Sequence, residues 1–218
     1  MLIQTNFRLA TTPAPARTYS PDVPELLAHT RPCAVTLFPE NAVIYAQGAA
    51  AGPLYLVEFG AVRICRLTVD GRRQISAFHF GGDVFGFEAD DEHHFYAESI
   101  DGAGIRVLRP SGSDGLAAET LPLVLQGLRR AQEHLLVLGR QNAVERMAAF
   151  FLDLAERQDA DDLIELPMQR NDIADYLGLT FETVSRVLRK LKDVRSIRLP
   201  SLQQVEILDR AALETMCE

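Results

Sequence analysis

The chain has 218 residues, enough for one large domain or two modest ones, and its contents of 47% hydrophobic and 24% charged residues are those of an ordinary globular protein. Its net charge is −8, which taken alone argues against binding to nucleic acid. No apolar run approaches the roughly 18 residues that a membrane-spanning helix requires. The amino-terminal stretch also lacks the basic flank and apolar core of an export signal. We therefore expect a cytoplasmic protein with no membrane segment.

The first part of the chain divides at about residue 24. Residues 1–24 contain four prolines among threonines and alanines, a composition that predicts a flexible arm. Beyond it, short apolar runs rich in Val, Ile, Phe and Tyr are separated by Gly or acidic turns, which is typical of strands. Their number and spacing favour a jelly-roll β-barrel, which we assign to residues 25–117. The strands are predicted at 34–38, 42–46, 54–60, 61–69, 74–80, 96–100 and 104–109.

Alternation within one strand predicts which side chains face the barrel interior. In the run AVRICRLTV, Val62 and Ile64 are expected to point inward, whereas Arg63 and Arg66 are expected to point into solvent. The dipeptide Asp70-Gly71, between this run and the next strand, is a strong signal for a tight hairpin. The barrel should therefore carry a hairpin with a buried and a charged face.

A long helical stretch follows, which we assign to residues 118–142. Its apolar residues recur at steps of four, three, four and three, the seam spacing by which two helices pack side by side. The stripe could instead pack on the chain's own barrel. Because the seam is so regular, we favour a parallel homodimer with two-fold symmetry. The expected interface residues are Val124, Leu128, Ala131, Leu135 and Leu138.

Two short helices joined by a tight turn are predicted near the carboxyl end. Ile173 and Leu177 are four residues apart and share one face of the first helix. Gly178 can supply the left-handed residue that ends this helix, and Thr180 is a candidate N-cap for the next. The second helix is expected over residues 181–192. This arrangement is a helix-turn-helix, whose second helix enters the DNA major groove.

The outward face of the second helix carries Glu182, Ser185 and Arg186. Arg can grip the O6 and N7 of guanine, and Glu can accept from the N4 amine of cytosine. These three are therefore the predicted base-reading residues, although an ordinary helical hairpin would show the same apolar spacing and turn glycine. Contacts to the DNA backbone are expected from Arg170, Thr180, Arg189 and Lys190.

The rest of the carboxyl-terminal part completes a winged helix. Another helix is predicted over residues 143–158, and the polar run 159–162 resembles a linker. Residues 196–199 and 204–208 are expected to form a β-hairpin around Pro200. The predicted fold class is thus α+β, with an N-terminal jelly-roll β-barrel, a long dimerisation helix and a C-terminal winged helix-turn-helix over residues 143–218.

The distribution of charge agrees with this division. The segment 167–200 holds seven basic and four acidic residues, a balance of +3, which leaves −11 for the remainder. An acidic body with a locally basic module suits a protein that meets phosphates on one face only. The same numbers would also arise from ordinary charge scatter, so they support the interpretation without deciding it.

Taken together, these parts resemble the CRP/FNR superfamily of bacterial transcription factors. QISAFHFGGDVFGFEA (74–89) is similar to the cyclic-nucleotide-binding-like cassette of that family, and NAVERMAAFFLDLAER (142–157) to the stretch that follows its dimer helix. DIADYLGLTFETVSR (172–186) is similar to the FNR and FixK branch. The resemblance implies that Glu182, Ser185 and Arg186 contact bases in operators of the TTGAT…ATCAA kind. Phe181 stands where the cyclic-AMP-receptor branch has an arginine, which also favours an FNR-type site.

The resemblance further implies a transcription activator that acts without a cofactor. Cyclic-AMP binders hold the ligand phosphate with an Arg-Ser or Arg-Thr pair, and our alignment places His94 and Phe95 there. The N-terminal cysteine run that holds an iron–sulfur cluster in FNR is missing as well. What remains resembles the FixK branch, which implies recruitment of RNA polymerase and control of genes for low oxygen or nitrogen metabolism. A haem-gated or small-molecule-gated regulator is the alternative.

Cysteine and histidine usage bounds the remaining chemistry. Cys33, Cys65 and Cys217 lie far apart without a C-x-x-C pair, so no zinc finger is predicted. We interpret the first two as buried and inert, and expect Cys217 to be exposed. The pair His93 and His94 among acids could bind a metal ion, although a solvated loop is favoured. His79 is interpreted as a core or turn residue.

An enzyme of the metal-dependent cupin type would use a similar barrel. Such enzymes need two or three histidines and a carboxylate that converge inside it. Only one histidine of this chain, His79, lies on a predicted strand. We therefore expect a DNA-binding regulator that is not an enzyme.

Overall fold

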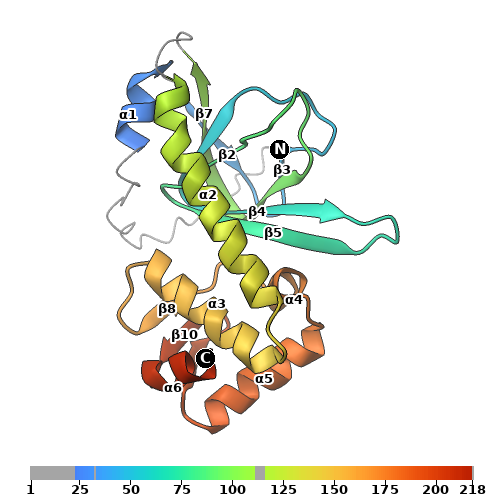
Figure 1. The fold of residues 1–218 in the computed structure, drawn as a ribbon, viewed down its shortest axis with the longest axis vertical. Helices are drawn as coiled ribbons and strands as arrows, with labels where there is room; N and C mark the ends of the chain where they lie inside the picture. Colours follow the sequence, from blue (N-terminus) through green and yellow to red (C-terminus); the bar gives the residue numbers. More distant parts are fainter. Residues whose placement is uncertain (1–22, 32, 111–115, 218) are drawn as a thin grey trace, which may run out of the picture.

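The computed structural model describes residues 23–31, 33–110 and 116–217. A curled antiparallel sheet forms the N-terminal part, and a long helix, α2 (Leu116–Leu138), runs along it toward a smaller C-terminal part made of helices and a short sheet (Figure 1). The predicted α+β fold class is confirmed. The arm predicted at residues 1–24 lies outside the described residues except for Val23 and Pro24, which begin helix α1 (Val23–Ala28).

The large sheet is built around two long strands, β4 (Leu54–Leu67) and β7 (Tyr96–Pro110). Its main order is β1-β7-β4-β5, while β2 and β3 also pair with β7 and β6 pairs with β4, all antiparallel. The predictions of separate strands at 54–60 and 61–69, and at 96–100 and 104–109, were therefore wrong, because each pair of runs is one bent strand. The shorter strands are β1 (Thr30–Arg31), β2 (Val35–Phe38), β3 (Val43–Tyr45), β5 (Arg73–Phe80) and β6 (Val84–Phe85).

Both long strands bend at glycines that face each other. Gly60 has a φ of 80° and Gly102 a φ of 115°, a backbone region that other residues rarely adopt. A Cβ atom on Gly60 would lie only 2.1 Å from the carbonyl oxygen of Gly102. The register between β4 and β7 also shifts here, between Gly60 and Val62. These paired bends allow the sheet to curl.

The smaller part contains four helices and a three-stranded sheet of order β8-β10-β9. The predicted hairpin is confirmed, but Pro200 lies within strand β9 rather than in the turn. The polar run 159–162, interpreted as a linker, leads directly into β8, an edge strand of this sheet that pairs with β10. The elements are α3 (Ala143–Arg157), β8 (Leu163–Glu165), α4 (Arg170–Leu177), α5 (Phe181–Asp193), β9 (Ile197–Ser201), β10 (Gln204–Ile207) and α6 (Arg210–Met216).

One apolar cluster joins the curled sheet to the C-terminal helices. The ring of Phe78, on β5, lies 4.9 Å from that of Tyr176 on α4 and 6.5 Å from that of Phe150 on α3. Ile75 and Met147 are buried in the same cluster. The sheet and the helices therefore share a core. The domain bounds at residues 117 and 142 stay predictions.

Candidate nucleic-acid interface

The turn between α4 and α5 is determined by two residues. Gly178 ends α4 in the left-handed conformation, with φ 62° and ψ 41°. Thr180 then caps α5, because its Oγ1 accepts a hydrogen bond from the amide of Thr183 at 3.2 Å. From α3, the side chain of Arg146 donates to the carbonyl oxygen of Leu177 at 3.0 Å and so satisfies the end of α4. The predicted helix-turn-helix is confirmed, and α4 and α5 are held as one unit.

Helix α5 is divided into a buried and an exposed face as predicted. Its inner residues are Val184, Val187, Leu188 and Leu191. On the outer face, Glu182 and Arg186 are exposed one helical turn apart. Phe181, next to them, is 46% exposed. An acceptor and a guanidinium fork are therefore displayed together where a recognition helix meets base edges.

Two of the predicted base-reading side chains are already oriented by neighbours at the helix start. The guanidinium of Arg186 donates to Oγ1 of Thr183 at 3.1 Å. The pKa of Glu182 is lowered by a hydrogen bond from a backbone amide and by one from the Thr180 side chain. Glu182 is consequently an anion at neutral pH, the state in which a carboxylate can accept a hydrogen bond from a base amine.

The third predicted base reader is placed differently. Ser185 is half-buried, and its Oγ is buried without a hydrogen-bond partner among the described residues. To reach a base edge this hydroxyl would have to rotate about χ1, a change between staggered rotamers. Ser185 is thus near the reading edge but does not present its hydroxyl in this conformation.

The candidate phosphate contacts lie on both helices. Thr180, Arg189 and Lys190 are exposed, whereas Arg170, at the start of α4, is half-buried. None of the three cations forms an ion pair within the described parts of the chain. Cations without an internal partner are free to neutralise phosphates.

Helix α2 presents an apolar face that its own chain does not cover. Leu128 is 52% exposed and Leu135 66%, and Val124 and Ala131 are exposed on the same side, while Leu138 is half-buried. The opposite side of α2 contacts the body through Leu123, Arg130 and His134. The alternative that the stripe packs on the chain's own barrel is therefore wrong for the first four positions. Other exposed leucines extend the face, namely Leu121, Leu125 and Leu136.

A cavity of about 270 Å³ lies between the turn after β5 and helix α2. Asp83, in that turn, accepts from Arg157 of α3 at 2.9 Å and from Arg130 of α2 at 3.0 Å. Burial opposes ionisation of Asp83, but the two arginines and His79 hold its pKa below the usual value. His79, half-buried beside it, has a pKa lowered to about 4, mainly by loss of contact with water. His79 lies on strand β5 and lines the cavity, so its interpretation as a core or turn residue stays a prediction.

The residues around this cavity do not fit a cyclic nucleotide. Its phosphate would need a cation from the chain, yet the segment 81–97 has five acids and neither Arg nor Lys. The two arginines that reach the cavity are already paired with Asp83. His94, at the position aligned with the phosphate-binding arginine, instead pairs with Asp90 at 3.0 Å on the exposed surface. The cavity therefore lacks the charge-assisted donors that hold a phosphate.

Histidine and cysteine environments differ partly from the predictions. His93, expected in a solvated loop, is buried and stacks on Tyr45 with ring centroids 3.6 Å apart. Cys65 is buried as predicted, and burial raises the pKa of its thiol to about 12, whereas Cys33 and Cys217 are half-buried. In the parts of the chain that the structure describes, no three His, Cys, Asp or Glu side chains lie together as a metal site would require.

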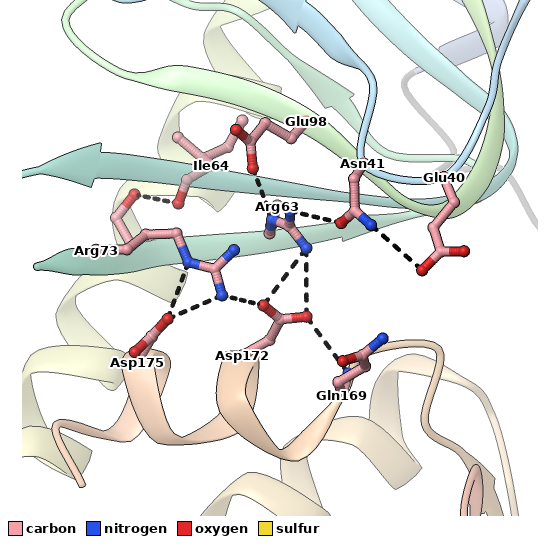
Figure 2. Close-up of polar contacts among 10 residues, drawn as sticks. Glu40, Asn41, Arg63, Ile64, Arg73, Glu98, Gln169, Asp172 and Asp175 are labelled. Carbon is pink, nitrogen blue, oxygen red and sulfur yellow. Dashed lines mark hydrogen bonds and ion pairs between the residues drawn. The ribbon is translucent and has the colours of Figure 1, made fainter. Parts of the chain in front are cut away.

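Sequence reasoning missed one polar cluster and placed its central residue wrongly. Arg63 was predicted to point into solvent, but it is only 5% exposed because α4 covers that face of the sheet. Its guanidinium contacts Glu98 of β7 and Asp172 of α4 (Figure 2). Alternation along a strand cannot reveal that a helix more than a hundred residues later in the chain packs on that face.

Of the helices that the structure describes, none is both long and apolar enough to cross a membrane.

Comparison with known families and curated proteins identifies related regulators. Residues 145–216 match the Crp-like helix-turn-helix domain, and residues 35–99 match the cyclic nucleotide-binding domain. The nitrogen fixation regulation protein FixK of Rhizobium meliloti (strain 1021) is 48% identical over 186 residues, which cover 85% of this chain and 88% of that protein. The protein of the same name from Azorhizobium caulinodans is 44% identical over 192 residues, covering 83% of this chain and 77% of its own length.

A solved structure supports the same likeness. FixK2 from Bradyrhizobium japonicum superposes with a TM-score of 0.78 at 36% sequence identity, over 85% of this chain and 98% of that one. The likeness thus extends over both the curled sheet and the helix-turn-helix. The two parts are arranged in one chain as in that regulator.

Proposed function

Because this chain belongs to the CRP/FNR family, among its FixK-type transcription regulators, we propose that it binds palindromic DNA as a homodimer and activates transcription by recruiting RNA polymerase. Exposed loops of the curled sheet and of the wing are the proposed contacts to the polymerase. Its proposed targets are genes for low-oxygen or nitrogen metabolism, reached in the bacterial cytoplasm.

The observation that carries the proposal is the exposed edge of α5. In a TTGAT half-site, Arg186 would hold the guanine through O6 and N7, and Glu182 would accept from a cytosine N4 amine. Ser185 would add a base contact once its hydroxyl turns outward. Arg170, Thr180, Arg189 and Lys190 would contact phosphates, which gives salt-dependent affinity with little sequence preference.

Dimerisation would follow from the uncovered face of α2. Two such helices, packed in parallel along Val124, Leu128, Ala131, Leu135 and Leu138, would bury apolar surface that one chain leaves in water. The two-fold axis between them would place two α5 helices on successive major-groove faces, about 34 Å apart.

Activity without a cofactor is part of the proposal. The pairing of Asp83 with Arg130 and Arg157 supports it, since these charges are satisfied within the chain. The alternative, gating by haem or another small molecule, is favoured by the cavity beside α2. An absorbance spectrum of the purified protein, together with DNA binding with and without added nucleotide, would separate the two.

The direct test is binding to a TTGAT…ATCAA duplex and to a scrambled duplex of the same composition at moderate salt. We expect preference for the palindrome by roughly a thousandfold or more, the lower end of specific recognition. Equal affinity for both duplexes would contradict the proposed function.

A further inference from the structure

Four charged residues join the β4–β5 hairpin to helix α4 and are termed here the hairpin cluster: Arg63, Arg73, Asp172 and Asp175. Arg63 Nη1 lies 3.3 Å from Asp172 Oδ2, and Arg73 Nε donates to Asp175 Oδ2 at 2.9 Å. The second nitrogen of the Arg73 fork also contacts Asp172. Figure 2 shows both guanidinium groups pointing from the sheet toward the first turns of α4. The cluster therefore connects the curled sheet to the first helix of the DNA-binding unit.

Because Arg63 and Asp172 of the hairpin cluster are buried, its ion pairs are stable in only a narrow range of orientations of α4 on the sheet. The side chains of Arg63 and Asp172 are 6% and 4% exposed, so each charge depends on hydrogen-bonded partners instead of water. Among the described residues, every cation that pairs with Asp172 comes from the hairpin. Charge-assisted hydrogen bonds have narrow distance and angle preferences, whereas the neighbouring contact between Phe78 and Tyr176 is apolar and less directional. The cluster thus favours one orientation of α4 on the sheet.

Contacts within the curled sheet and its loops hold Arg63 in place independently of α4. Arg63 Nε donates to Glu98 at 2.8 Å, and its Nη2 donates to Asn41 Oδ1 at 2.9 Å. Asn41 has a φ of 59°, a left-handed conformation that costs energy for a residue with a side chain, though Asn tolerates it better than most. The loop backbone supports it, because the Asn41 amide donates to Ser99 O at 3.1 Å. Arg63 is therefore pre-oriented toward α4.

The α4 side transmits this orientation to the reading helix. Asp172 also accepts from the backbone amide of Gln169 and so completes the start of α4. The tight turn at Gly178 and the shared buried face connect α4 to α5. A second ion pair, between Asp83 and Arg157, fixes the far end of β5 to α3. A rotation of α4 on the hairpin would accordingly rotate α5 as well.

We propose that Arg63 and Arg73 are positioning residues for DNA recognition, which set the angle of α5 relative to α2 by holding Asp172 and Asp175. This inference rests on the proposed function, since it concerns how the two reading helices of a dimer meet half-sites of fixed spacing. Neither arginine contacts DNA. Both act through α4.

The test uses the full-length chain with three substitutions on the accessible side of the cluster and one matched control. Arg73→Gln removes the fork, Arg73→Lys keeps the charge without the fork, and Asp175→Asn removes the acceptor on α4. The control is Arg72→Gln, which loses the same charge one residue earlier, where the side chain is 83% exposed and, within the described ranges, forms an ion pair with Asp70 of the hairpin tip alone. Arg63 is left intact because its removal would take the cation from Glu98 and leave the buried Asp172 with Arg73 as its remaining cation among the described residues.

The first readout is affinity for the TTGAT…ATCAA palindrome. Arg73→Gln should weaken it on the order of fivefold, within the usual range of coupled pairs, and Arg73→Lys should lose less. Asp175→Asn should weaken it too, although removing a negative charge near DNA would by itself strengthen binding. The double variant Arg73→Gln/Asp175→Asn should lose less affinity than the product of the two single losses, because both substitutions remove the same ion pair. Unchanged binding by Arg73→Gln, or tighter binding by Asp175→Asn, would overturn the inference.

The second readout is the discrimination between this palindrome and one whose spacer is longer by one base pair. Wild type and Arg72→Gln should discriminate clearly, while Arg73→Gln should discriminate less, because a looser α5 accepts more spacings. A general loss of folded protein would lower both affinities and leave their ratio unchanged, and that result would count against positioning.

A third readout needs no DNA and separates this inference from the proposed function. Hydrogen exchange of the α4 amides, residues 170–177, should speed up in Arg73→Gln, with the amides of β7 unchanged. If wild type showed no preference for the palindrome, the proposed function would fail, and the exchange rates would still decide whether the cluster holds α4. Unchanged exchange in α4 would refute the positioning role.

Discussion

At the residue scale, the reading edge depends on a few side chains at the start of α5. Glu182 and Arg186 are exposed and one turn apart; Glu182 is held by Thr180, the N-cap of α5, and Arg186 by Thr183 in the first turn. Lys190 lies one further turn along, exposed and without an ion pair among the described residues. Base contacts and phosphate contacts should therefore respond differently to substitution.

Arg186→Ala should relax the preference for guanine in the half-site by about 1–3 kcal/mol. Lys190→Ala is the matched variant, because it removes a cation from the same helix and should weaken binding to all duplexes nearly equally. It should also lower the salt dependence of binding by about one unit per protomer. Affinities for wild-type and guanine-substituted duplexes at several salt concentrations would measure both. An equal loss for every duplex in Arg186→Ala would refute its role in base reading.

His134 gives the protein a predicted dependence of stability on pH. It stacks on Tyr176 with ring centroids 3.9 Å apart, and burial lowers its pKa to about 4. The unfolded chain, with an ordinary histidine pKa near 6.5, binds this proton at higher pH, so stability is present above pH 6.5 and is lost as pH falls toward 4. The charged groups around it are Arg130, Glu133, Asp153 and Arg157.

His134→Phe should keep the stacking and flatten the loss of unfolding free energy between pH 6.5 and 5. Urea unfolding at a series of pH values would test this. A profile that keeps its slope in His134→Phe would exclude His134 as the cause.

At the scale of elements, the curl of the sheet depends on the paired bends of β4 and β7. Gly60 has a positive φ and its α-carbon faces the backbone of Gly102, so both strain and a clash oppose any side chain. Gly71 in the hairpin turn has nearly the same φ of 79° but open space around it. The two positions therefore separate backbone strain from steric exclusion.

Gly71→Ala should cost about 1 kcal/mol of unfolding free energy, the strain of the left-handed region alone. Gly60→Ala should cost clearly more, about 3 kcal/mol or above, because the strand pair must also move apart. Chemical denaturation of both variants provides the comparison. Equal costs would mean that the bend at Gly60 can relax freely.

Local signals explain which elements could be predicted from sequence. The turn at Gly178, the cap at Thr180 and the inward residues of α5 were predictable because each depends on neighbours a few residues away. Helices α1 and α6 and strand β8 are short, and the only clear signal among them is Asp209, whose side chain caps α6. The glycines at positions 60 and 102 were visible in the sequence as breaks between apolar runs. They were interpreted as ends of separate strands, whereas each is a bend within one strand.

The errors concern long-range burial. Arg63 occupies an outward position in the alternation of its strand, and it is buried because α4 packs over it. His93 lies in an acidic run typical of a solvated loop, yet its ring stacks on that of Tyr45 in strand β3. Nothing local distinguishes these residues from their exposed neighbours. The hairpin cluster could not be predicted for the same reason.

At the scale of the whole molecule, the uncovered face of α2 would hold two chains together, so that their two basic segments, residues 167–200, bind one DNA duplex. Leu128 lies near the middle of that face and is 52% exposed. In a dimer it would be buried against its counterpart, where a carboxylate could not be accommodated. The oligomeric state should therefore depend on this one position.

Leu128→Glu should shift the protein to a monomer at micromolar concentration and weaken palindrome binding far more than half-site binding. Arg129→Glu, also on α2 but outside the predicted apolar stripe and paired with Glu133, should remain a dimer. Sedimentation velocity and duplex binding would report both. A dimeric Leu128→Glu protein would move the proposed interface elsewhere.

The apolar cluster shared by β5, α3 and α4 has a practical consequence for dissecting this protein. A fragment cut at residue 142 would carry Phe150 and Tyr176 without the strand that shields them, and the remaining piece would leave Phe78 bare. Each half would tend to aggregate or rearrange, so the reading unit is best studied with its sheet attached.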